Sequence, residues 1–153
     1  MQTPEPLIRI SVRDQRLDLV GGDGILASYS ISTSRFGLGS EEGSMKTPLG
    51  RFRIGEKIGH DFPSGTMFCS RRPLGPDDPP PPTDDHILSR ILWLDGLEAH
   101  NANTRARFIY IHGTNHEDEI GQPASHGCVR MKNADLIALF DQVPLGAEVV
   151  IES

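Results

Sequence analysis

The chain has 153 residues, enough for one domain with its own hydrophobic core. Its net charge of −6 argues against a nucleic-acid-binding surface, which needs clustered positive charge. No apolar run reaches membrane-spanning length, so we expect no membrane insertion. The N-terminus also lacks the basic and apolar regions of a signal peptide. As written, the sequence therefore predicts a cytoplasmic protein, or a periplasmic or cell-envelope one if it is a mature form.

The first third of the chain predicts strands joined by tight turns. Apolar and polar residues alternate there in a period of two, and Asp14–Gln15 and the glycines near Asp23 supply the turns. The strands are expected over residues 7–12, 15–20 and 25–32. After a glycine-rich loop, Thr47-Pro48-Leu49-Gly50 should turn the chain into another strand, with Phe52 and Ile54 on one face.

The middle of the chain shows little periodicity. Residues 73–85 are rich in proline and should form an exposed, extended loop that could cap a groove. Cys69 lies beside Phe68 in a short apolar run, which favours a buried free thiol. Residues 87–94 and 107–111 are predicted strands, the first ending at an Asp-Gly turn.

The C-terminal part predicts the clearest helix. Asn133 is a good N-cap, and the helix should end at Pro144 and Gly146. One apolar stripe is formed at spacings of three and four residues by Leu136, Leu139, Phe140 and Val143. A last strand is expected over residues 147–151.

The stretch 109–131 carries the chemistry. His112 ends a short apolar run, residues 108–111, and Cys128 lies between Gly127 and a β-branched residue. A cysteine attacks as its thiolate, which needs a base or positive surroundings at neutral pH. A lone Ser-His-Gly-Cys would more often be structural, but a cysteine, a histidine at a strand end and glycine-flanked N–H groups together offer a nucleophile, a base and donors for an oxyanion.

This stretch resembles the YkuD-type L,D-transpeptidase family. The family signature, His-Gly-Thr after a strand and then Ser-x-Gly-Cys-x-Arg, is matched by residues 112–114 and 125–130. The similarity extends to Lys46-Thr-Pro-Leu-Gly-Arg-Phe, to a Gln at position 15 and to the C-terminal helix and strand. It implies one catalytic domain over residues 1–153 with a β-rich α+β fold, a mixed β-sandwich or barrel-like YkuD fold with one C-terminal helix.

The resemblance also implies roles for the residues of the motif. Cys128 would be the nucleophile, His112 the general base, and the carbonyl of Gly113 the group that orients the imidazole. Backbone N–H groups of His126, Gly127 and Cys128 would bind the oxyanion. Because relatives accept other polar residues at position 126, the His126 side chain should not be the base.

Two further residues of the motif have less certain partners. Ser125 should hydrogen-bond within the loop or to His112. Arg130 would pair either with a substrate carboxylate or with an acidic side chain of the protein. His116, in a polar run, should simply be exposed.

The implied activity acts on peptidoglycan stem tetrapeptides or soluble muropeptides and needs no cofactor. The thiolate attacks the carbonyl at the L-centre of the third residue, D-Ala leaves, and a thioester remains. An amine would resolve it as an L,D-transpeptidase, and water as an L,D-carboxypeptidase. The missing signal peptide and the loop favour a hydrolase of cell-wall recycling, whereas the family favours transpeptidation. Carbapenem-type β-lactams should acylate Cys128 in both cases.

Two other classes of protein compete with this interpretation. His112, His116, His126 and Cys128 are zinc-ligand types, but there is no Cys-x-x-Cys pair and His-x-x-x-His lies in a predicted loop, so we expect no metal. A papain-like protease is disfavoured because its cysteine precedes its histidine. A muropeptide-binding protein without activity is the non-enzymatic alternative.

Overall fold

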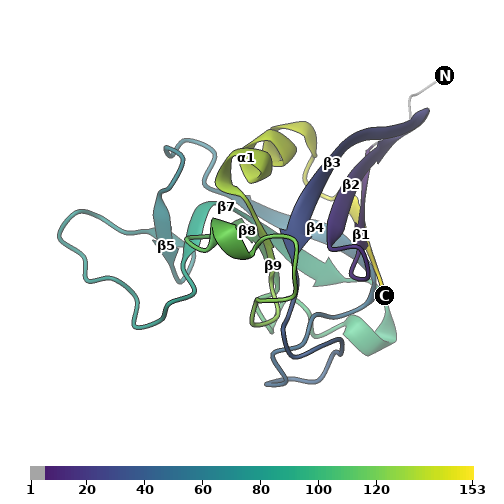
Figure 1. The fold of residues 1–153 in the computed structure, drawn as a ribbon, viewed down its shortest axis with the longest axis horizontal. Coiled ribbons are helices and arrows are strands. Elements are labelled where there is room, and N and C mark those ends of the chain that lie inside the picture. Colours follow the sequence, from purple (N-terminus) through teal and green to yellow (C-terminus); the bar gives the residue numbers. More distant parts are fainter. Residues whose placement is uncertain (1–5) are drawn as a thin grey trace.

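The computed structural model describes residues 6–153, and within them ten strands form one sheet (Figure 1). The strands are β1 (Leu7–Ser11), β2 (Arg16–Gly21), β3 (Gly24–Ser32), β4 (Gly50–Ile58), β5 (Met67–Cys69), β6 (Arg72–Pro73), β7 (Ile87–Gly96), β8 (Tyr110–Gly113), β9 (Val129–Met131) and β10 (Glu148–Glu152). Their order is β4-β10-β1-β2-β3-β9-β8-β7-β5-β6, and β4 also pairs with β7. That second pairing closes the sheet from β4 to β7 into a barrel, which confirms the predicted β-rich, barrel-like fold.

The N-terminal strands form as the alternation predicted. β1 and β2 are antiparallel, with Ile8 opposite Leu19 and Ile10 opposite Leu17. All four side chains are fully buried in the barrel core, because strand residues two apart face the same side. β1 also pairs in parallel with β10, so the first and last described strands lie side by side.

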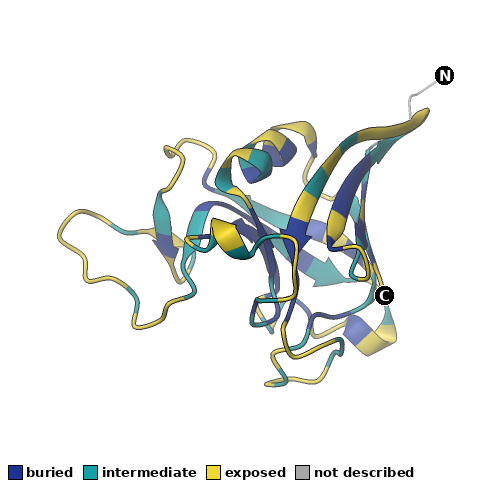
Figure 2. Ribbon diagram, in the orientation of Figure 1, coloured by how far each residue is buried: buried dark blue, intermediate teal, exposed yellow. Residues whose placement is uncertain are grey.

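The helix α1 (Asn133–Gln142) covers one end of the barrel beside β7 and β8 (Figures 1 and 2). Its apolar stripe is buried as predicted, and Val143, just past its end, is buried too. The predicted N-cap was wrong by one residue: Lys132 holds that position. Asn133 is instead drawn into the fold, where its side-chain amide donates to Thr114 O at 3.0 Å and its Oδ1 accepts from Ser89 Oγ at 2.7 Å.

The strands of the middle region were only partly predicted. Phe52 and Ile54 are fully buried on the same face of β4, and β7 ends at the expected Asp-Gly pair. β4, however, continues to Ile58, and the short hairpin β5–β6 was missed. The prediction of a buried Cys69 was wrong: Phe68 takes the inward position, so the alternation turns Cys69 outward, where it is exposed as a free thiol.

The strand before His112 starts later than predicted. Phe108 has a φ of 58°, in the left-handed region, and the residue is 49% exposed, so β8 begins only at Tyr110. The ring lies 5.9 Å from that of Trp93, and the guanidinium of Arg71 lies over it. The Phe108 side chain therefore packs on the outer surface, and not in the core as the apolar run suggested.

The rest of the chain is loop and short helix. The 3₁₀ helices η1 (Ala99–Asn101) and η2 (Glu117–Glu119) lie in predicted loops. Residues 74–86 have no regular structure and extend away from the barrel as a mostly exposed loop, as expected (Figures 1 and 2). Among the described residues, none of the helices has the length and apolar character needed to cross a bilayer.

Candidate active site

Two neighbouring parallel strands bring His112 and Cys128 to one face of the sheet. In the β8–β9 register Ile111 lies beside Val129 and His112 beside Arg130. Ile111 and Val129 belong to the core, so His112 and Arg130 face the opposite side. Cys128 directly precedes β9, and by the same alternation it shares that side. The fold thus brings together the cysteine and the histidine that the sequence singled out.

His112 is completely buried, and one of its ring nitrogens is fixed. Nδ1 lies 2.5 Å from the carbonyl oxygen of Gly113, the orienting contact that the resemblance implied. Nε2 has no hydrogen-bond partner among the described residues. Burial lowers the pKa of His112, partly opposed by the charge of Asp85 and by the Gly113 contact. The imidazole is therefore neutral at rest, with Nδ1–H donating to Gly113 and Nε2 free to accept a proton.

Gly113 is required by a close approach. A Cβ atom at this position would run into the side-chain oxygen of Asn133 and the carbonyl of Leu88. Only glycine leaves room for both neighbours, so the strand can deliver His112 without distortion.

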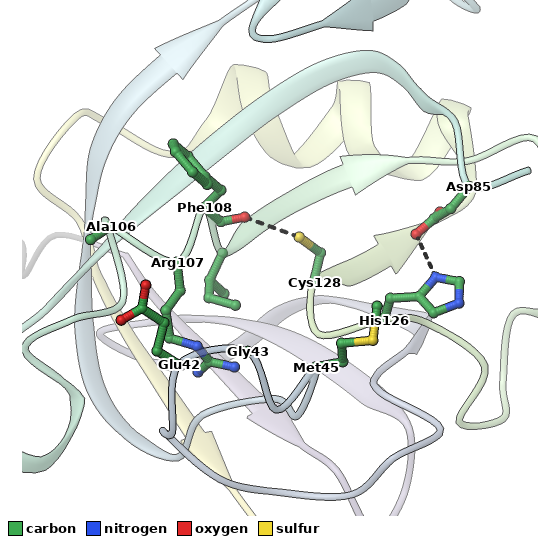
Figure 3. A pocket seen from close by; sticks show the side chains of 10 residues that line it. Glu42, Gly43, Met45, Asp85, Ala106, Arg107, Phe108, His126 and Cys128 are labelled. Atoms are coloured by element: carbon green, nitrogen blue, oxygen red, sulfur yellow. Dashed lines mark hydrogen bonds and ion pairs between the residues drawn. The ribbon is translucent and has the colours of Figure 1, made fainter. Parts of the chain in front are cut away.

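The Cys128 thiol contacts two backbone groups of the preceding strand region. Sγ–H donates to the carbonyl of Phe108 at 3.3 Å (Figure 3). The N–H of Tyr110 donates to Sγ at 3.3 Å. Burial, together with the nearby charge of Asp85, raises the pKa of the thiol to about 12, although Tyr110 N–H and the charges of Arg130 and Arg107 act against this. Desolvation thus opposes the thiolate that the sequence led us to expect, and the positive surroundings favour it. Transfer of the thiol proton to a base during the attack would avoid a free thiolate in this site.

The loop before Cys128 is held by its own hydrogen bonds. Ser125 Oγ–H donates to the carbonyl of Cys128 at 2.6 Å and accepts from the N–H of Gly127 at 3.3 Å, which confirms the predicted bond within the loop. Gly127 has a φ of 128°, a conformation that favours glycine. Its N–H, one of three expected oxyanion donors, is thus already engaged and would have to leave Ser125 to serve a substrate.

Two residues outside the motif, Thr47 and Gln15, stabilise the loop before Cys128 through hydrogen bonds. Thr47 is fully buried; its hydroxyl donates to the carbonyl of Gly127 at 3.0 Å and accepts from the N–H of Ser34 at 2.9 Å. The side chain of Gln15 binds both the N–H and the hydroxyl of Thr33, whose carbonyl accepts from the N–H of Ser125 at 2.9 Å. The Thr-Pro turn and the first hairpin therefore support the cysteine loop. The sequence alone had given these two segments no part in the site.

Arg130 pairs with acidic side chains of the protein, which is one of its two expected roles. Its side chain is buried and forms ion pairs with Asp85 at 2.9 Å and Glu119 at 3.2 Å. It does not line the pocket that contains Cys128. The ion pairs support the structural role, because the guanidinium already contacts two carboxylates of the protein; pairing with a substrate carboxylate stays a prediction.

Both ring nitrogens of His126 are occupied. Nε2 accepts from Arg35 Nη2 at 2.9 Å, and Nδ1 lies 3.1 Å from Asp85 Oδ2. With no free nitrogen, His126 is poorly placed to be the base, which agrees with the assignment to His112. His116, expected to be exposed, is instead half-buried, because its Nε2 lies 2.6 Å from the carbonyl of Asp84.

Asp85 is the site residue that the sequence did not reveal. It comes from the end of the proline-rich loop, and its carboxylate meets His126 and Arg130. Burial alone would raise its pKa, but His112, the contact with His126 and the charge of Arg130 together lower it. Asp85 is thus ionised at neutral pH. No local pattern distinguishes it from the exposed Asp84 beside it.

A pocket of about 420 Å³ opens over the cysteine, a size suited to a small ligand (Figure 3). It is lined by Glu42, Gly43, Met45, Asp85, Ala106, Arg107, Phe108, Ile109, His126 and Cys128. Across residues 6–153, no group of three or more His, Cys, Asp or Glu side chains converges as metal ligands would. The zinc alternative therefore has no ligand set in this part of the chain.

Comparison with known proteins defines the class. The family model described as the L,D-transpeptidase catalytic domain, YkuD, matches residues 5–151. The protein YqjB of Bacillus subtilis, whose name assigns it to the same activity, is 27% identical over 149 residues, covering 96% of this chain and 71% of its own length.

Solved structures share the fold. An L,D-transpeptidase from Mycobacterium smegmatis superposes with a TM-score of 0.65 at 14% identity, covering 97% of this chain and 59% of that one. The catalytic domain of an Enterococcus faecium L,D-transpeptidase acylated by ertapenem has a TM-score of 0.60 at 17% identity, covering 99% of this chain and 100% of that domain. The fold and site thus define an enzyme of the L,D-transpeptidase class. This chain belongs to the YkuD family.

Proposed function

We propose that the chain is a cysteine acyltransferase acting on the tetrapeptide stems of peptidoglycan or on soluble muropeptides. One observation carries this: a thiol that opens onto a pocket shares a sheet face with a buried neutral imidazole whose Nε2 is free. Such a pair can move a proton from sulfur to nitrogen as the sulfur attacks. The substrate class is taken from the family to which the chain belongs.

The first half-reaction forms a thioester. Sγ of Cys128 bonds to the carbonyl carbon of the third residue while its proton passes to Nε2 of His112. The tetrahedral oxyanion is bound by backbone N–H groups of residues 126–128. As the peptide bond breaks, the imidazolium returns the proton to the departing amine of D-Ala. No cofactor takes part in these steps.

The second half-reaction depends on the acceptor. An amine gives an L,D cross-link, and water gives the shortened stem as an L,D-carboxypeptidase. In both cases His112 takes a proton from the acceptor, and the sulfur leaves and is reprotonated. The pocket borders solvent and carries both acidic and basic side chains, so either acceptor could enter.

The same thiol should be acylated by carbapenem-type β-lactams. Attack on the strained lactam carbonyl opens the ring and leaves a thioester on Cys128. The Enterococcus faecium domain that shares this fold carries ertapenem as an acyl group. Intact-protein mass spectrometry after incubation with ertapenem should show one added inhibitor on wild type and none on Cys128→Ala.

The function is tested with a purified disaccharide-tetrapeptide, with products followed by mass spectrometry. Loss of one D-Ala without a dimer identifies a carboxypeptidase, and a dimer identifies a transpeptidase. The matched control for Cys128→Ala is Cys69→Ala, which removes the other, exposed cysteine. Turnover that survives in Cys128→Ala, or a wild type that binds the muropeptide without any turnover, would contradict the proposal.

A further inference from the structure

Asp85 reaches the reactive cysteine from outside the sequence motif. It ends the proline-rich loop, yet its side chain lines the pocket that contains Cys128 (Figure 3). Its Oδ2 lies 3.1 Å from Nδ1 of His126, and its Oδ1 lies 2.9 Å from Nη2 of Arg130. These partners are two residues before and two residues after the cysteine. The carboxylate is therefore fixed to both sides of the nucleophile.

The carboxylate is also linked to the strand pair that carries the base. Arg130, its ion-pair partner, and His112 are register partners on β9 and β8 and face the same side. The charge of Asp85 raises the pKa of His112, in opposition to burial and to Arg130, which lower it. Among the described residues no hydrogen bond joins Asp85 to His112, so this effect acts through space.

We propose that Asp85 is a positioning residue for acyl transfer, which stabilises the imidazolium of His112 and holds His126 next to the thiol. The inference rests on the proposed function. When the proton moves from Sγ of Cys128 to Nε2 of His112, a thiolate and an imidazolium form together in a site that disfavours charge. Asp85 stays ionised throughout and offsets the positive charge at the moment it appears.

The charged surroundings of Asp85 define what a pH experiment would report. Arg130 also forms an ion pair with Glu119, and His126 also accepts a hydrogen bond from Arg35. The groups that can titrate or carry charge around the pair are His112, His126, Cys128, Arg35, Arg107, Glu119 and Arg130. Neutralising Asp85 leaves this set with one more uncompensated positive charge, which disfavours the imidazolium further.

The chain offers two matched controls. Asp84 is adjacent and exposed, and it takes part in none of the ion pairs that hold Asp85, so Asp84→Asn removes the same charge one residue away. Asn115 anchors the loop without carrying charge: its side chain donates to the carbonyl of Asp84 at 2.9 Å and accepts from the N–H of His86 at 3.0 Å. Asn115→Ala therefore loosens the same loop while it leaves Asp85 ionised.

The test measures alkylation of Cys128 by iodoacetamide between pH 5 and pH 9, by intact-protein mass spectrometry. All variants carry Cys69→Ser, so that one thiol is observed. We expect Asp85→Asn to move the acid limb of the rate profile to lower pH by roughly one unit, the shift that loss of a nearby opposite charge produces. Asp84→Asn and Asn115→Ala should keep the wild-type limb.

Two results would overturn the inference: an Asp85→Asn profile that matches Asp84→Asn, or an Asn115→Ala profile that reproduces the shift of the acid limb. Should Asp85→Asn fail to fold, Asp85→Ser replaces it, because the smaller side chain leaves room for water beside Arg130. The pH profile of Asp85→Ser is then compared with the same two controls. Alkylation needs no peptide substrate. A wild type inactive on tetrapeptide would therefore refute the proposed function while the Asp85 measurement could still be interpreted.

Discussion

Thr47 offers a sharp test of how the cysteine loop is supported. Thr47→Val keeps the shape of the side chain but removes its hydroxyl, which leaves the carbonyl of Gly127 and the N–H of Ser34 without this partner. Both groups are buried, and an unsatisfied buried polar group costs about 1–3 kcal/mol. The expected loss in free energy of unfolding is therefore about 2–5 kcal/mol. For a chain of this length that lowers Tm by roughly 5–15 °C.

Thermal unfolding followed by circular dichroism, together with urea titration, measures this loss. The matched control is Thr66→Val, whose hydroxyl donates to the carbonyl of Pro63 at 2.7 Å on the surface, and which should stay within about 0.5 kcal/mol of wild type. Because Gly127 precedes Cys128, ertapenem acylation of Thr47→Val should also slow. A Tm within about 2 °C of wild type would refute the reasoning that these two bonds hold the loop.

Three other predictions concern the site. His112→Ala should lower turnover at least about 10²-fold, the usual contribution of a positioned base, whereas His126→Ala should lose much less; steady-state rates on tetrapeptide decide, and equal losses would reverse the assignment. Gly113→Ala should destabilise the fold by at least about 1–3 kcal/mol in urea titration, because its methyl group meets Asn133 and the backbone; a neutral result would contradict the close approach. Since the folded-state pKa of Asp85 lies below its ordinary value of 3.8, Asp85 contributes stability above that pH that is lost as pH falls through the folded pKa, and Asp85→Asn should lack this acid-dependent loss in melts between pH 2 and pH 5.

Local patterns predicted the parts of the fold that depend on local spacing. The alternation in β1 and β2 and the stripe of Leu136 and Leu139 are imposed by backbone geometry, so they can be read without knowing the partner strands. The motif likewise identified Cys128 and His112, because the thiol and imidazole needed for acyl transfer recur there in a fixed order.

What the sequence did not reveal depends on contacts between distant residues. Phe108 looked like core, but its outward turn depends on Trp93 and on the thiol that binds its carbonyl. Asp85 lies more than 40 positions from Cys128, in a segment without periodicity, and only the folded chain brings it to Arg130. The rise in the pKa of the thiol likewise comes mainly from burial, which the types of the neighbouring residues do not disclose.

The placement of β10 has a consequence for how the protein is made. This strand pairs with β1 on one side and with β4 on the other, so it joins two parts of the chain synthesised much earlier. Until Glu148–Glu152 leave the ribosome, the facing edges of β1 and β4 have no partner, and exposed strand edges invite aggregation. The nascent chain must therefore wait for β10 before the ring of strands can close.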